Sequence, residues 1–398
     1  RDYYASRGLG DVYKRQMQYG FSIKRKCYLL SVLLMTVWLT GCVQEEFEST
    51  PSPAGNGIRF TLTVPDVNLP SVSSRTMTGT GTAKKEDEIE TVDILVFDMS
   101  KTPAVFLEWV SATGVTQDLA DNSTVSFSAV LSPTTASTCI VVVANKELDN
   151  IVSGFTKGAT TKVEAMEKML HTQTGKWLAD GSTTGGYTRI PMYGEKVISK
   201  ITPSMNPITE INMKRMLARI DIRNNSVTSN FMVEEVYLAN YNTTGYIAPA
   251  WNTNGQVTEP APDTPVLPTG SGKMTEEGNA ILYSVNGNTP YDGEIYTFES
   301  LAAGDAGGAG QDGEASRKDA TCLIVKGKIG TGESTFYRVD FTKTGNTGEQ
   351  VEYLPLKRNH KYIITITQAL GTGYKSFSEA LASYTVMSNL KFRLIHYD

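Results

Sequence analysis

The sequence has little charge, little histidine and little cysteine for its length. Only 20% of its 398 residues are Asp, Glu, Lys or Arg, and the formal net charge is -5. A nucleic-acid-binding domain normally carries a clustered excess of Lys and Arg, so this composition argues against nucleic acid as a partner. Thr, Gly, Ser and Val are abundant instead, which favours strands and turns over helices.

The motifs that indicate catalysis or metal binding are missing as well. The three histidines, His171, His360 and His396, have no second His, Cys or carboxylate cluster at ligand spacing. No GxSxG motif marks a nucleophile. Residues 308–313 read GAGQDG and match GxGxxG, but no strand leads directly into them and no periodic helix follows, so we interpret them as a flexible loop. We expect neither enzymatic activity nor a cofactor nor a metal site.

An export signal stands near the N-terminus. Residues 1–16 precede the first methionine, and we interpret them as non-native flanking sequence. From Met17, a basic stretch at 24–26 leads into an apolar run at 27–39 that is too short for a comfortable membrane span. We therefore expect residues 17–41 to be a signal peptide.

The signal ends in Leu-Thr-Gly-Cys42, which resembles the lipobox of bacterial lipoproteins. In a lipobox the cysteine thiol takes a diacylglyceryl group, and several acyl chains hold the mature N-terminus on a membrane. Cys42 is therefore the predicted lipidation site. The alternative is an ordinary signal peptide that happens to contain a cysteine.

Two further cysteines belong to the mature chain. Cys139 and Cys322 each stand at the head of a strand-like run, far apart in the sequence. A disulfide would need their Cα atoms within about 7 Å of each other, and a chain of this length needs no disulfide framework. Two buried thiols are the simpler interpretation, and the sequence leaves the disulfide as the alternative.

The first strand-like run, residues 58–64, lies between two polar stretches. An acidic and then Pro/Gly/Ser-rich tether at 43–57 precedes it, and a polar stretch that contains Arg75 follows it. Backbone groups are costly to bury unpaired, so this early strand must pair with another part of the fold. Its alternation places four apolar side chains on one face: Ile58, Phe60, Leu62 and Val64.

Further strand-like runs form two groups of similar size. The apolar patterns predict strands at 90–97, 106–110, 123–131, 139–145, 189–196 and 210–222, and then at 233–241, 294–300, 322–329, 336–341 and 360–370. The run 139–145 is continuously apolar, which is typical of a strand covered on both faces. Residues 162–170 have the spacing of one short helix, and 243–278 reads as a long loop. The grouping predicts two β-sandwiches with a boundary near residue 212.

The chain ends in another alternating strand. Leu390, Phe392 and Leu394 face one way, while Lys391 and Arg393 face the other. A strand of this kind either completes its own domain or pairs with another molecule.

Taken in order, these motifs resemble the fimbrillins, the shaft subunits of type V pili in Bacteroides-type bacteria. The resemblance runs from the lipobox, the early strand and its arginine through ETVDILVFD, STCIVVVAN, IPMYGE, MKRMLARIDI, IYTFES and TCLIVKGKI to LKRNHKYIITIT. Residues 358–362, RNHKY, are its most specific piece, and it spans the chain from Cys42 to Gly373.

The resemblance implies a mainly β fold of two transthyretin-like β-sandwich domains with a short helix and long loops. It divides the mature chain into a lipid-anchored propeptide with a removable first strand (42–75), an N-terminal domain (76–212) and a C-terminal domain with a terminal donor strand (213–398). It also implies a structural subunit without catalytic activity, in a fimbrium that supports adhesion.

The family assembles by strand exchange, and the resemblance implies which positions take part here. A precursor reaches the outer membrane as a lipoprotein, and a trypsin-like, arginine-specific protease cuts after an arginine that corresponds to Arg75. Strand 58–64 is then released, and the C-terminal strand of a neighbouring copy fills the groove with Leu390, Phe392 and Leu394. The implied partners are other copies of the chain, accessory pilins, the protease and the outer membrane, and the implied end point is the surface fimbrium.

Several alternatives stay open at this stage. One is that Arg75 is an ordinary loop arginine, and another is that the terminal strand completes its own domain. An alternative function is a tip or accessory subunit, which needs no free donor strand. A further alternative is a monomeric glycan-binding surface lipoprotein, with Trp109, Trp177 and Trp251 as candidate aromatic contacts.

Overall fold

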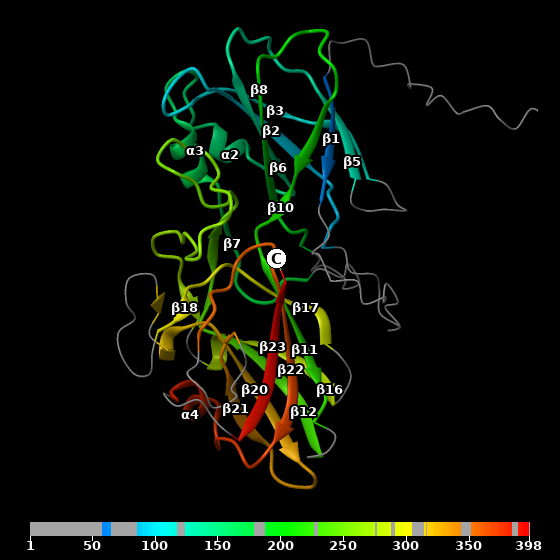
Figure 1. Ribbon diagram of the computed structural model, residues 1–398, viewed down its shortest axis with the longest axis vertical. Coiled ribbons are helices and arrows are strands. Elements are labelled where there is room, and N and C mark those ends of the chain that lie inside the picture. The colour runs from blue at the N-terminus through cyan, green and yellow to red at the C-terminus, as the bar shows by residue number, and fades with distance from the viewer. Residues whose placement is uncertain are drawn as a thin grey trace, which may run out of the picture. The chain divides into compact units, whose positions relative to one another are not determined.

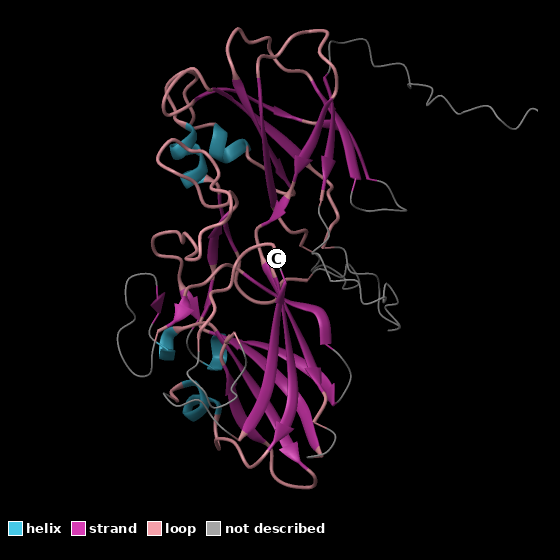
Figure 2. Ribbon diagram, viewed as in Figure 1, coloured by secondary structure: helices cyan, strands magenta, loops and turns pink. Residues whose placement is uncertain are grey.

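The computed structural model describes two β-sandwiches that follow each other along the chain (Figures 1 and 2). The described residues are 58–64, 86–117, 124–178, 188–226, 230–274, 277–287, 291–304, 314–315, 317–343, 352–383 and 389–397. They belong to one compact unit, Asn56–Asp398. The predicted signal peptide, Cys42 and Arg75 lie outside the described residues.

The N-terminal sandwich packs a four-stranded sheet on a five-stranded sheet. The first has the order β4 (Thr113–Gln117), β5 (Thr124–Ala129), β1 (Ile58–Thr63) and β9 (Ile208–Asn212), and the second has the order β10 (Lys214–Arg215), β8 (Met192–Ile198), β6 (Thr138–Ala144), β2 (Val92–Asp98) and β3 (Val105–Ser111). Strand β1 alternates between buried and more exposed residues because one face of its sheet lies against the core. Strand β6 is buried at every residue, as its continuous apolar run predicts.

Two short helices cover the outer face of the five-stranded sheet. They are α2 (Asp149–Val152) and α3 (Lys162–Lys168). A capping box starts α3, because the Glu164 backbone N–H donates to the Thr161 hydroxyl and the Thr161 backbone N–H donates to the Glu164 carboxylate. Buried residues of both helices share an apolar cluster with β2 and β6. The five-stranded sheet is therefore covered on both sides.

The C-terminal sandwich packs two four-stranded sheets face to face. One has the order β17 (Tyr291–Thr297), β11 (Ala218–Asn224), β22 (Lys361–Ala369) and β23 (Leu390–Tyr397), and the other has the order β16 (Ile281–Gly287), β12 (Phe231–Ala239), β20 (Cys322–Ile329) and β21 (Thr335–Val339). A third helix, α4 (Phe377–Leu381), packs against β20 and β21. Cys322 is buried in this region and Cys139 in the N-terminal sandwich, and both are thiols.

Short elements connect these sheets. They are β7 (Leu170–Thr172), which pairs with β14 (Thr244–Tyr246), β13 (Tyr241–Asn242), which pairs with β15 (Lys273–Met274), β18 (Ala302–Ala303), which pairs with β19 (Glu314–Ala315), and the 3-10 turns η2 (Glu277–Asn279) and η3 (Arg317–Asp319). Within the described residues, no helix is both long enough and apolar enough to cross a membrane.

The chain passes from the first sandwich to the second between β10 and β11. The prediction of a single strand over 210–222 is wrong, because this stretch contributes β9, β10 and β11 to three different sheets. Met213, Met216 and Leu217 are all buried, but Met213 belongs to the core of the N-terminal sandwich and the other two to the cluster under the helices. The apolar pattern therefore continues through the crossing without marking the breaks.

The prediction of a mainly β fold is confirmed. The one predicted helix, 162–170, is present as α3, while α2, α4, β4 and β16 are elements that the sequence patterns did not indicate.

Candidate functional site

Strand β1 occupies an interior position in its sheet (Figure 1). Its 6 residues pair antiparallel with β5, from Ile58 opposite Ala129 to Thr63 opposite Thr124, and its other edge pairs parallel with β9. An interior strand uses the backbone donors and acceptors of both edges. Its removal would leave a slot with unpaired backbone groups on both walls.

The apolar face of β1 lies wholly inside the N-terminal core. Ile58, Phe60, Leu62 and Val64 are at most 4% exposed. The ring of Phe60 stacks on that of Phe127 in β5, with 5.0 Å between the centroids and 6° between the planes. Full burial of side chains of this size stabilises a fold by about 1.5–3 kcal/mol each. A slot without β1 would therefore be a deep apolar groove.

The two walls of this slot differ in regularity. The pairing with β5 runs without interruption over the whole of β1. On the other side, Phe60 pairs with Ile208 and Leu62 pairs with Ile211, so β9 carries one extra residue. Glu210 within this bulge has a φ of 60°, in the left-handed region. Strand β5 is thus the regular wall and β9 the irregular one.

The C-terminal strand β23 lies in its own sandwich. It forms the edge of its sheet and, among the described strands, pairs only with β22, in an antiparallel ladder. Leu390, Phe392 and Leu394 are at most 4% exposed and belong to the C-terminal core. The predicted donor side chains complete their own domain in this structure, so donation would require the strand to leave it.

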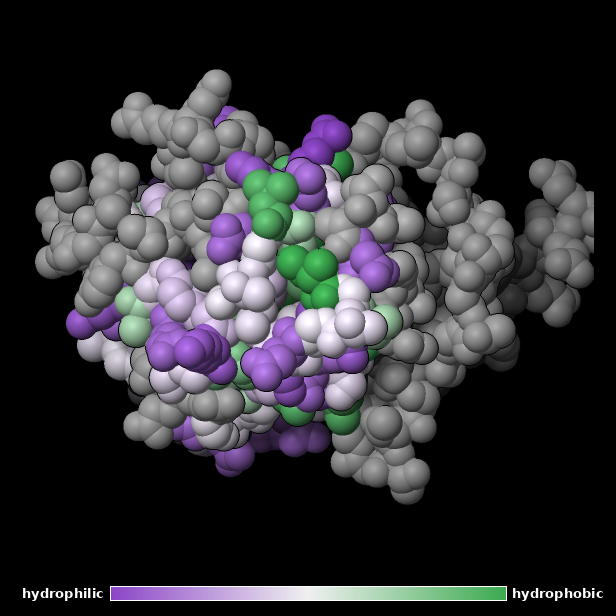
Figure 3. Space-filling model, turned by 90° about the horizontal axis from the view of Figure 1, so that it is seen from below, coloured by the Kyte–Doolittle hydropathy of each residue, from purple (hydrophilic) through white to green (hydrophobic). Residues whose placement is uncertain are grey.

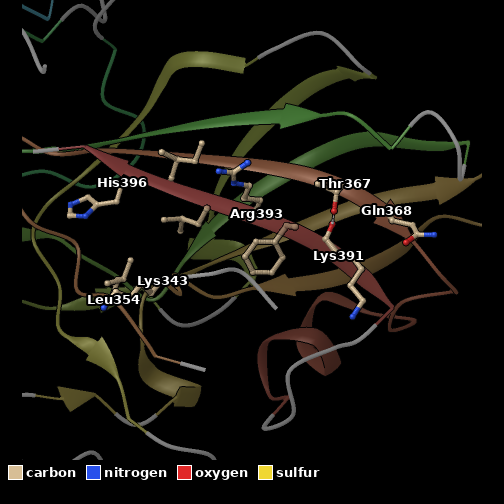
Figure 4. A pocket seen from close by; sticks show the side chains of 10 residues that line it. Lys343, Leu354, Thr367, Gln368, Lys391, Arg393 and His396 are labelled. Atoms are coloured by element: carbon tan, nitrogen blue, oxygen red, sulfur yellow. Dashed lines mark hydrogen bonds between the residues drawn. The ribbon is translucent and has the colours of Figure 1, made fainter. Parts of the chain in front are cut away.

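An open groove of about 980 Å³ follows β23 (Figure 4). Lys391, Arg393 and His396 of β23 line it, together with Thr367 and Gln368 of β22. Leu354, Phe392 and Leu394 add apolar side chains to the same lining. The Thr367 hydroxyl donates to the backbone oxygen of Lys391 over 3.2 Å. Lys391 and Arg393, on the outward face of β23, carry charge to the solvent, as expected of an edge strand that is protected from aggregation.

A charge cluster holds the start of the described chain after Arg75. The Glu86 carboxylate accepts hydrogen bonds from Arg219 Nη1 at 2.8 Å and from the Tyr296 hydroxyl at 2.7 Å. Arg215 Nε also donates to the backbone oxygen of Glu86, over 3.3 Å. Burial alone would raise the pKa of Glu86, but the two arginines and the tyrosine hydroxyl outweigh burial and hold this pKa below its usual value. Glu86, which follows the predicted cut in the sequence, thus contacts side chains of β10, β11 and β17.

The sequence did not single out Glu86 as a partner of these arginines. The one available signal was that Arg215 and Arg219 stand within an apolar run, where buried arginines need acidic partners. The partner lies 133 residues from Arg219, so only the fold identifies it.

Arg358, in the RNHKY motif, is a structural residue. Its Nε and Nη2 donate to Oε2 of Glu299 over 2.8 and 2.6 Å. Its Nη1 and Nη2 also donate to the backbone oxygens of Ile247 and Tyr246, over 2.7 and 2.8 Å. The planar fork of a guanidinium suits such a set of acceptors. The motif therefore fixes the start of β22 against the loop after β14.

The structure does not bring the three histidines together. His360 and His396 meet across β22 and β23, with 2.6 Å between Nδ1 and Nε2, and His396 also stacks on Tyr362. His171 packs on Trp177 instead, and burial lowers its pKa to about 4. Among the described residues, no group of three or more His, Cys, Asp or Glu is placed to hold a metal ion.

The three candidate tryptophans contact one apolar cluster. Trp177 is 4% exposed and donates its indole N–H to the backbone oxygen of Thr188 over 2.8 Å. Trp109 and Trp251 pack against the same apolar cluster that contains Trp177. Trp177 is thus part of the core, whereas Trp109 and Trp251 are half-buried.

Exposed apolar side chains are scattered in the described part of the chain. Those of large size are Val130, Val197, Met232, Val266, Leu282 and Leu370. On the described surface in Figure 3, small apolar areas lie among hydrophilic residues. Single exposed apolar residues are normal on protein surfaces and do not by themselves mark a binding site.

Three solved structures of bacterial proteins are similar to this chain. The tip fimbrial protein Mfa3 from Porphyromonas gingivalis, with a C-terminal truncation, is 15% identical, with a TM-score of 0.45 over 86% of this chain and 99% of that one. A putative cell adhesion protein from Bacteroides eggerthii is 16% identical, with a TM-score of 0.46 over 86% and 96%. Another from Parabacteroides distasonis is 17% identical, with a TM-score of 0.44 over 85% and 99%. No curated protein sequence matches the chain.

A protein-family model matches residues 58–266, which is more than half of the chain. Its description is major fimbrial subunit protein (FimA). The match begins at Ile58, the first residue of β1, so it includes the strand that occupies the interior slot. On the strength of this match, the chain belongs to the FimA family of major fimbrial subunit proteins and is a fimbrial subunit of the cell surface.

Proposed function

We propose that the chain is a shaft subunit that polymerises by strand exchange into a fimbrium that supports adhesion. It is exported as a lipoprotein through Cys42, and a trypsin-like, arginine-specific protease cuts it after Arg75 at the outer membrane. Strand β1 is then released, and β23 of a neighbouring copy takes its place. Accessory pilins join the same filament. The observation that carries the proposal is the interior position of β1, the first strand of the described residues, between β5 and β9.

Exchange would give β23 a second hydrogen-bonded neighbour. In its own sandwich this edge strand pairs with β22, whereas in the slot it would lie between β5 and β9. Each ladder hydrogen bond contributes about 0.5–1.5 kcal/mol net. The apolar face of the strand is buried in both places, so the additional ladder is the contribution that favours the filament over the cut monomer.

The surroundings of the other arginines support Arg75 as the cleavage site. Arg59 lies within β1, which is paired along both edges. Arg215 and Arg219 are held by carboxylates at the crossing between the sandwiches. Proteases cut extended, accessible segments with few backbone hydrogen bonds, so paired or ion-paired arginines are poor substrates. The sequence around Arg75, SVSSRTMTG, is polar and has no apolar strand pattern, which suits a cleavage site.

A disulfide that holds β23 in its own sandwich tests the proposal. Thr365 and Arg393 are directly opposite in the ladder of β22 and β23. We expect the oxidised Thr365→Cys, Arg393→Cys precursor to be cut by trypsin and yet to stay monomeric, because β23 cannot leave. Addition of a reductant should restore the ladder of polymers on a gel run without boiling.

The single variant Thr365→Cys is the matched control and should polymerise with or without oxidation. If the oxidised double variant polymerises as well as this control, β23 is not the donor strand.

One observation favours a second candidate, a tip or accessory subunit. Strand β23 is fully built into its own sandwich, as expected of a subunit that accepts a strand but donates none. Such a subunit would stay monomeric after cleavage and would still bind a labelled peptide of residues 389–397 in the slot. Peptide binding without a ladder would favour the tip subunit, and a ladder would favour the shaft subunit.

A further inference from the structure

We propose that the donor strand enters the slot in one register and one direction, with Phe392 in the place of Phe60 and β23 parallel to the strand it replaces. This inference rests on the proposed strand exchange. It adds which residue of the neighbouring copy fills which pocket.

The two strands carry the same inward pattern. In each, one phenylalanine stands between two branched aliphatic residues at alternating positions, and all three side chains are buried. The residues are Ile58, Phe60 and Leu62 in β1, and Leu390, Phe392 and Leu394 in β23. At the next inward position the two strands differ, because His396 would take the place of Val64. Of the two residues between them, Arg59 in β1 matches Lys391 in β23, whereas Thr61 would be replaced by Arg393.

The central pocket of the slot selects the register. Phe127 presents a flat ring to whatever replaces Phe60, with the 5.0 Å stacking distance of the present pair. A shift of two residues would place a leucine on this ring and force Phe392 into the site of Ile58 or Leu62. One pocket would then be underfilled and another overfilled, and both changes destabilise a core. A shift of one residue would turn Lys391 and Arg393 into the core.

The backbone of the slot selects the direction. The order Leu-Phe-Leu is the same from either end, so the side chains leave the direction open. A strand parallel to β1 keeps the uninterrupted antiparallel ladder with β5. A reversed strand would have to make its antiparallel ladder with β9, where the bulge at Glu210 interrupts the pairing. Because antiparallel pairing is the more stable kind per residue, the regular wall favours the direction of β1.

The outward positions make the two directions distinguishable. Arg59 is opposite Ser128 and Thr61 is opposite Ser126 in the present structure. In the proposed direction, Lys391 therefore comes opposite Ser128, and Arg393 comes opposite Ser126. A reversed strand would exchange these two neighbours.

Disulfide trapping between copies tests both parts of the inference. Subunits with Lys391→Cys or Arg393→Cys are mixed with subunits that carry Ser128→Cys or Ser126→Cys, cut with trypsin, allowed to polymerise and then oxidised. Directly opposite Cα atoms in an antiparallel pair are about 4.5–5.5 Å apart, which is within the reach of a disulfide.

We expect a disulfide-linked dimer on a denaturing, non-reducing gel for two of the four mixtures, 391 with 128 and 393 with 126, and loss of this band in the two swapped mixtures. The native thiol of Cys139 does not compete, because it is buried and burial raises its pKa to about 12.

Each other outcome overturns a defined part. A linked dimer in the swapped mixtures would overturn the direction. Polymers that give no linked dimer in any mixture would overturn the register. The ladder on an unboiled gel is recorded before oxidation, and its absence for subunits without introduced cysteines would overturn the proposed strand exchange itself. The four positions lie on outward faces, so the melting curve of each single variant should match that of the unmodified chain.

Discussion

At the scale of single residues, Arg358 shows what a sequence motif identifies and what it leaves out. The RNHKY motif is the most specific part of the resemblance to fimbrillins, but its arginine serves an internal ion pair with Glu299, 59 residues earlier in the chain. A lysine at this position would present a point charge and lose the paired geometry. The sequence could indicate the family through this residue, whereas the partner depends on how β22 and the loop after β14 come together.

His171 makes stability depend on pH. Burial lowers its pKa from the usual 6.5 to about 4, and the charge of Lys146 acts in the same direction. The His171 imidazole therefore becomes protonated near pH 6.5 in the unfolded chain, but only near pH 4 in the folded chain. The stability linked to this group is complete above pH 6.5 and is lost as the pH falls towards 4.

We expect the free energy of unfolding, measured with denaturant, to fall over this range, and His171→Phe to remove part of the fall. NMR titration of the His171 imidazole supplies the direct measurement. A midpoint near 6.5 in the folded chain would contradict the prediction.

At the scale of elements, strict alternation predicted both strands of the proposed exchange well. The run 58–64 corresponds to β1, and the terminal run starts at Leu390 as β23 does. The apolar pattern did not predict the strand boundaries where one apolar stretch of sequence contributes to several cores, as from β9 to β11. It also failed for β4, whose residues are mostly exposed, because a strand that buries little leaves no apolar period. The alternation of apolar residues shows which face of a strand is buried, but which strands it pairs with depends on the folded sheet.

The proposed role of β1 predicts that a covalent link to its wall blocks assembly. Arg59 and Ser128 are directly opposite across β1 and β5. In the oxidised Arg59→Cys, Ser128→Cys precursor, cleavage by trypsin should proceed, but β1 should stay in the slot and no ladder should form. Reduction should release β1 and start polymerisation. The variant Arg59→Cys alone should behave like the unmodified chain, and a ladder from the oxidised double variant would show that β1 need not leave.

At the scale of the whole molecule, the interior slot and the occupied donor strand belong to different sandwiches. The sequence could suggest that both terminal strands are exchangeable, because both are short, alternating and close to an end of the chain. It could not show that β23 is already paired at home, since that depends on the ladder with β22. In the proposed assembly, the place beside β22 and the slot between β5 and β9 of another copy therefore compete for β23. The rest of both sandwiches must stay folded while this strand moves.

The cluster around Glu86 fits this requirement, and its contribution is measurable. Glu86 joins the chain before β2 to Arg219 of β11 and Tyr296 of β17. Because these partners outweigh the effect of burial and hold its pKa below the usual 4.5, the linked stability is complete above that value and is lost as the pH falls through the lowered pKa.

We expect Glu86→Gln to reduce the free energy of unfolding at pH 7 by about 1–3 kcal/mol. The difference from the unmodified chain should shrink below pH 4.5, because protonation then removes the same charge in both. The control is Glu90→Gln. The side chain of Glu90 is 59% exposed and pairs with Arg189 at the surface, and such exposed ion pairs contribute little to stability, so this variant should change stability little at any pH. A difference for Glu86→Gln that stays constant down to pH 3 would mean that its charge does not stabilise the junction.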